Sequence, residues 1–91
     1  MNIEEALARA ATTIVSEGLA DEVMALAPMF DALAVVPPSG EVEADLRTRL
    51  AAALGDDASL ALTSGADVRE IARRGERLLA MVIAIDVLGP R

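Results

Sequence analysis

The sequence predicts an all-α protein, a small four-helix bundle, and three observations lead to this class. The chain is rich in alanine and leucine, the residues with high helix propensity, and it contains one aromatic residue, Phe30. Apolar residues recur at alternating spacings of three and four, the period of an amphipathic helix. The single good strand candidate, residues 82–87, has no partner of comparable quality, and a lone strand would leave its backbone groups unsatisfied.

The first helix is expected over residues 3–17. Asn2 precedes it as an N-cap, and Glu5 stands three residues later, as in a capping box. Gly18 can adopt the left-handed conformation that ends a helix. The buried face is predicted to contain Ile3, Leu7, Ala10 and Ile14.

The second helix is expected over residues 20–34, with a kink near Pro28. Proline removes a backbone donor and crowds the preceding turn, but the apolar positions keep their phase across it. One bent helix is therefore expected instead of two separate ones. The Val-Val-Pro-Pro-Ser-Gly sequence at 35–40 then predicts a stiff extended loop. The apolar positions of this helix are Leu19, Val23, Leu26, Phe30 and Leu33.

The third helix is expected over residues 41–54. Two acid–base pairs at i, i+4 spacing, Glu43 with Arg47 and Asp45 with Arg49, indicate a solvated face. The residues predicted to face the core are Val42, Leu46, Leu50 and either Ala53 or Leu54.

A short helical turn is expected near residues 58–62, with Asp57 as its cap. The last helix is expected over residues 67–88, capped by Asp67 with Glu70 three residues later. No polar residue interrupts its second half from residue 78 to 85. We expect this helix to be central and enclosed on nearly all sides, by the first two helices, by a second copy, or by both.

The chain is short and acidic. Its 91 residues form one expected domain, near the size at which a single core becomes marginal. It carries fifteen acidic residues and eight basic ones, which gives a net charge of −7. The acids dominate residues 1–46, and this half argues against extensive phosphate binding, which requires clustered positive charge.

The composition excludes several kinds of chemistry. Histidine, cysteine and lysine are absent, so the commonest general base, a thiolate nucleophile and a Schiff-base amine are all missing. The Asp56–Asp57 pair lacks the remaining ligands of a calcium loop, and no glycine-rich phosphate loop is present. We therefore expect no enzyme activity, metal, cofactor or small-molecule substrate. Two early glutamates argue against a signal peptide, and no apolar run is long enough for a membrane span, so a cytoplasmic location is expected.

A non-catalytic interaction module, such as an adaptor, an inhibitor or a regulatory subunit, is the function that these features favour. A helix that is apolar around its circumference has more surface to bury than three short neighbours cover. The expected partner is a second copy in a homodimer, or another protein. The predicted partner-binding residues are Ile71, Gly75, Leu78, Leu79, Val82 and Ile85.

A small helix-turn-helix DNA-binding regulator, using residues 58–77, is the alternative. Ala61, Gly65 and Ile71 stand at the offsets of that motif, whose second helix enters the major groove. The short first helix and the neighbouring acids count against it. The predicted DNA-binding residues are Arg69, Arg73, Arg74 and Arg77.

Overall fold

The computed structural model describes residues 2–35 and 40–88, apart from the side chains of residues 40, 42 and 43. All regular secondary structure in this part of the chain is helical, which confirms the all-α class. The helices are α1 (Ile3–Ser16), α2 (Ala20–Met24), α3 (Ala27–Leu33), α4 (Gly40–Leu54), α5 (Asp56–Thr63) and α6 (Val68–Leu88).

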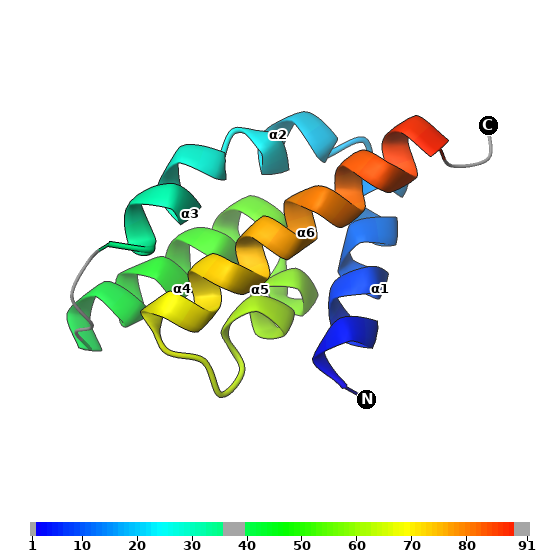
Figure 1. The fold of residues 1–91 in the computed structure, drawn as a ribbon. Coiled ribbons are helices and arrows are strands. Elements are labelled where there is room, and N and C mark those ends of the chain that lie inside the picture. The colour runs from blue at the N-terminus through cyan, green and yellow to red at the C-terminus, as the bar shows by residue number, and fades with distance from the viewer. Residues whose placement is uncertain (1, 36–39, 89–91) are drawn as a thin grey trace.

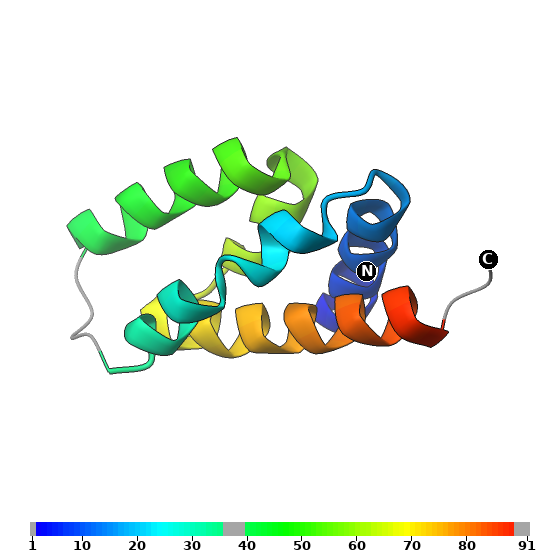
Figure 2. The same cartoon turned by 90° about the horizontal axis from the view of Figure 1, so that it is seen from above.

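Helix α6 is the spine of the molecule, as expected. It crosses the whole bundle in Figure 1, and it packs mainly against α1 and α3, with further contacts to α2 and α5. Helix α4 packs chiefly on α5. Figure 2 shows α4 and α6 on opposite sides of the molecule, with α2 and α3 running between them. The bundle therefore encloses one apolar core, to which every helix contributes.

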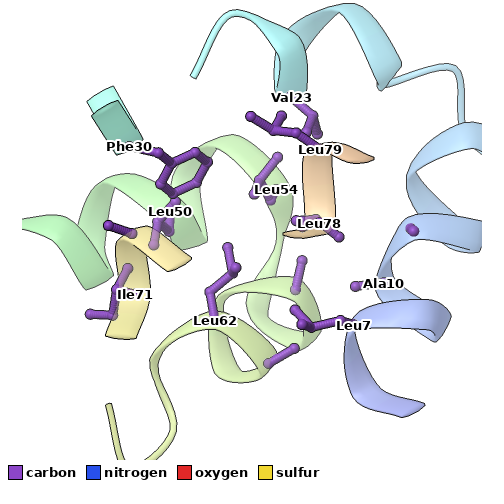
Figure 3. Packing of buried hydrophobic residues seen from close by; sticks show 14 of the residues in the cluster. Leu7, Ala10, Val23, Phe30, Leu50, Leu54, Leu62, Ile71, Leu78 and Leu79 are labelled. Carbon is purple, nitrogen blue, oxygen red and sulfur yellow. The ribbon is translucent and has the colours of Figure 1, made fainter. Parts of the chain in front are cut away.

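Aliphatic side chains from distant parts of the sequence meet in that core (Figure 3). The ring of Phe30 is completely buried and lies beside aliphatic side chains of α4 and α6. Because the core contains no other aromatic ring, helices approach one another through leucine, valine and alanine. The largest fully buried side chains are Phe30, Leu7, Ile14, Leu50, Leu62, Ile71, Leu78, Val23, Val68 and Val82.

The first helix begins and ends as its sequence predicts. The side chain of Asn2 accepts a hydrogen bond of 2.8 Å from the backbone N–H of Glu5, so the expected cap is present. Gly18, which has a φ of +74°, lies just beyond the last turn. Leu7, Ala10, Ala11 and Ile14 are buried, whereas Ile3 is half-buried.

The segment expected as one bent helix consists of two short helices, so that prediction is wrong in this respect. Pro28 is the second residue of α3, where its missing N–H would have had no partner within α3. The helical turn before Pro28 is tighter than an α-helical turn, because the backbone N–H of Leu26 donates to the carbonyl of Val23, three residues back. The predicted phase is nevertheless kept, because Val23, Phe30 and Leu33 are all buried.

Helix α4 buries Leu46, Leu50 and Leu54, and it carries the expected Asp45–Arg49 ion pair at 3.0 Å. Helix α5 is longer than the predicted turn at 58–62. It begins after Gly55, whose φ of +88° suits glycine, and no side chain caps it. Of the loop predicted at 35–40, Gly40 is instead the first residue of α4, and residues 36–39 lie outside the described residues, as do the burial of Val42 and the pairing of Glu43.

Candidate interaction surface

The inner side of α6 packs into the core of its own subunit. Asp67 caps the helix by accepting a hydrogen bond of 2.9 Å from the N–H of Glu70, as expected. Gly75 lies against the ring of Phe30, and a Cβ at this position would come within 3.0 Å of three ring carbons. The small residue therefore lets α3 and α6 approach closely within one chain.

Five of the six residues predicted to contact a partner lie on this inner side. Ile71, Gly75, Leu78, Leu79 and Val82 are buried, and Ile85 is half-buried. The five buried residues are not accessible to another molecule while the subunit keeps this fold, whereas Ile85 is partly accessible. The candidate contact surface of α6 therefore consists of other residues.

The opposite side of the last turns of α6 is apolar and exposed. Successive residues on a helix are rotated by about 100°, so positions 80, 83, 84, 87 and 88 share one face. This end was expected to be enclosed by the first two helices, by a second copy, or by both, and the first two helices alone do not enclose it: Ile83 is 46% exposed, Val87 65% and Leu88 82%. We call this surface the α6 strip; it consists of Ala80, Ile83, Ala84, Val87 and Leu88.

The strip stands out because the same side of α6 is charged up to Arg77. The exposed residues that precede it on this side are Arg69, Arg73, Glu76 and Arg77. From Ala80 onward the exposed residues on this side are all apolar. Figure 1 shows this end of α6, coloured orange to red, extending beyond α1. No helix among the described residues therefore buries this apolar surface.

The surface of the α6 strip is uneven, because small and large side chains lie in separate rows. Ala80 and Ala84 form one row at i, i+4 spacing, and Ile83 and Val87 form a parallel row of larger side chains. Rows of this spacing are the ridges and grooves through which helices interlock. A surface with one raised and one lowered row is of the kind that can interlock with another helix.

Arg77 is the last charged residue on the outer side of α6 before the strip, and it forms an ion pair with Glu4 of α1. The guanidinium of Arg77 donates two hydrogen bonds, of 2.6 and 2.8 Å, to the two carboxylate oxygens of Glu4. These hydrogen bonds lower the pKa of Glu4 and raise the pKa of Arg77. The pair joins the first turn of α1 to the middle of α6.

The four arginines predicted to bind DNA are largely engaged within the subunit. Arg74 donates a hydrogen bond of 2.7 Å to the carbonyl of Ser64, so it closes the turn between α5 and α6. Arg73 pairs with Glu70, and Arg77 pairs with Glu4. Only Arg69 has no hydrogen bond or ion pair with the described residues. Helices α5 and α6 are consecutive and joined by a short turn, but α6 does not present four unpaired arginines.

Other kinds of site receive no support in the described ranges. Within residues 2–35 and 40–88, no group of three or more acidic side chains is arranged to hold a metal ion. No helix in these ranges is both long and apolar enough to cross a membrane. Comparisons with protein-family models, curated proteins and solved structures find no match for this chain. Its function is therefore inferred from the geometry and charge of its own residues.

The sequence did contain a signal for the strip. Positions 80, 83, 84, 87 and 88 follow the helical period as regularly as the buried positions do. An uninterrupted apolar run therefore contains two stripes, and the period alone does not say which of them faces the core.

Proposed function

We propose that this protein is a non-catalytic helical interaction module that self-associates, with two copies joined through their α6 strips. The supporting observation is the change on the outer side of α6, from charged residues to exposed aliphatic residues at Ala80. Contiguous exposed apolar surface of this kind is typical of protein contact sites. The shape of the strip favours a two-fold arrangement, in which the Ile83–Val87 row of each copy lies along the Ala80–Ala84 row of the other.

The strip supports a weak dimer. Fully burying a large aliphatic side chain contributes about 1.5–3 kcal/mol. Ile83, Val87 and Leu88 together expose about two such side chains, so their burial contributes about 3–6 kcal/mol per subunit. Two strips contribute about 6–12 kcal/mol, against an association cost of at least about 4 kcal/mol. The expected dissociation constant is therefore about micromolar or weaker.

Sedimentation across a concentration series tests this function. The wild type is expected to change from monomer to dimer with rising concentration. Val87→Ser removes about 1–2 kcal/mol from each side of a two-fold interface, so the dissociation constant is expected to rise about 30- to 1,000-fold. Val35→Ser is the matched control, because Val35 is 80% exposed and follows α3 at the far end of the bundle.

Both variants change exposed side chains, so neither is expected to disturb the core. A wild type that stays monomeric at millimolar concentration would refute the proposal. The same conclusion follows if Val87→Ser and Val35→Ser affect dimerisation equally.

A further inference from the structure

A second candidate surface lies on another part of the molecule. A trough of about 830 Å³ runs between α1 and α5 and continues over the turn that joins α4 to α5. Its lining extends from Asn2 to Glu17, the whole length of α1, which corresponds to about 22 Å at the rise of an α-helix. No residue of α6 contributes to it. The trough is therefore separate from the α6 strip.

Small side chains create the trough. Ala6 and Ala10 of α1 and Ala58 and Ala61 of α5 form its floor; Ala6 is half-buried and the other three are buried. Larger residues at these positions would fill the space between the two helices. Leu60 adds an apolar edge, and its side chain is 62% exposed. The trough thus combines an alanine-lined floor with one exposed aliphatic side chain.

The charged residues of the lining are mainly acidic. Glu17, Asp56 and Asp57 contribute three carboxylates, and Arg9 contributes one guanidinium. The trough therefore carries an excess of negative charge on a chain whose net charge is already −7. Such a surface attracts a positively charged partner and repels an acidic one.

We propose that this trough docks an amphipathic helix of a partner protein, with an apolar face toward Leu60 and the half-buried Ile3 and Ala6, and with basic residues beside the carboxylates. The length of the trough fits about four helical turns better than it fits a compact small molecule. Its walls are helices whose backbone groups are bonded internally, so they offer no strand edge to an extended segment. This proposal does not depend on self-association.

Two labelled synthetic peptides of about sixteen residues test the proposal. Both carry leucine at positions 1, 4, 5, 8, 11 and 12, so they share one apolar face. The first has arginine on its polar face, and the second has glutamate there. Fluorescence anisotropy is expected to show binding of the arginine peptide, weakening with salt, and no binding of the glutamate peptide.

Variants of the trough separate a specific site from general attraction. Leu60→Ser is expected to weaken binding of the arginine peptide about 5- to 25-fold, because it removes the exposed apolar edge. The separate variant Asp57→Asn is also expected to weaken binding of the arginine peptide at low salt. Asp31→Asn is the matched control, because it makes the same charge change at an exposed position of α3 outside the trough.

Circular dichroism checks that each variant keeps its helical content. The proposal is overturned if the arginine peptide does not bind, if both peptides bind equally, or if Leu60→Ser leaves the affinity unchanged. Equal effects of Asp57→Asn and Asp31→Asn would also overturn it, because general attraction would then account for binding.

Discussion

Gly75→Ala is expected to destabilise this protein, although the same change stabilises an ordinary helix. Alanine is favoured over glycine by about 1 kcal/mol in a helix interior, and Gly75 lies inside the longest helix of the bundle. Its φ is not in the left-handed region, so alanine causes no backbone strain. The expected loss arises entirely from the contact with Phe30.

The magnitude follows from that contact. An added Cβ would come within 3.0 Å of three carbons of the Phe30 ring, which is completely buried. Overpacking of this kind costs about 1–3 kcal/mol. With the propensity gain of about 1 kcal/mol subtracted, we expect a net loss of up to about 2 kcal/mol in the free energy of unfolding. The midpoint of thermal unfolding is then expected to fall by up to about 16 °C.

Urea unfolding of the variants, followed by circular dichroism, measures this loss. The protein concentration is kept low because self-association would add to the apparent stability. In a Phe30→Leu background the added methyl group has more room, so Gly75→Ala is expected to be neutral or stabilising there. Ala80→Gly, at an exposed position of the same helix, calibrates the propensity term at about 1 kcal/mol.

Two results would refute this reasoning. One is a Gly75→Ala protein that is more stable than the wild type. The other is a loss of the same size with and without the Phe30 ring, because the double-mutant cycle would then show no coupling between the two positions.

Two further predictions concern the ends of helices. Glu4→Gln is expected to lower stability at neutral pH, with an effect that shrinks as the solution is acidified. The pKa of Glu4 is lowered in the folded state, so its contribution is present above the unfolded pKa and is lost as pH falls through the folded pKa. Urea unfolding at neutral pH, at a series of acidic pH values and at high salt checks this, and a pH-independent difference would contradict it. Asn2→Ala is expected to cost about 0.5–2 kcal/mol and Asn2→Asp much less, because Asp also caps; equal losses would exclude the cap as the cause.

Local features of this fold could be predicted from short stretches of sequence. The hydrogen bond from Glu5 to Asn2 and the one from Glu70 to Asp67 each join residues three positions apart. A residue and its neighbours within one turn are sufficient to specify such a cap. For the same reason, the first and last helices begin within one residue of their predicted starts.

The division of residues 20–34 into two helices depended on two opposing features, the continuous apolar period and the hydrogen bonds lost at Pro28. The apolar period continues across Pro28, and the buried positions Val23 and Phe30 follow it. Period alone favours one helix, but the backbone can keep that phase while losing the hydrogen bonds that proline cannot make. The break is therefore a local effect that the apolar pattern conceals.

The amino-acid sequence by itself determined that the chain is helical, where most helices begin, and which residues carry the helical apolar period. Only the tertiary structure decided which of the two apolar stripes of α6 is buried, that Gly75 receives the ring of Phe30, and that Glu4 meets Arg77. It also decided that small residues of α1 and α5 face each other across a trough. The physical reason is range: caps and periods depend on neighbours within a turn, whereas burial depends on how all the helices pack together.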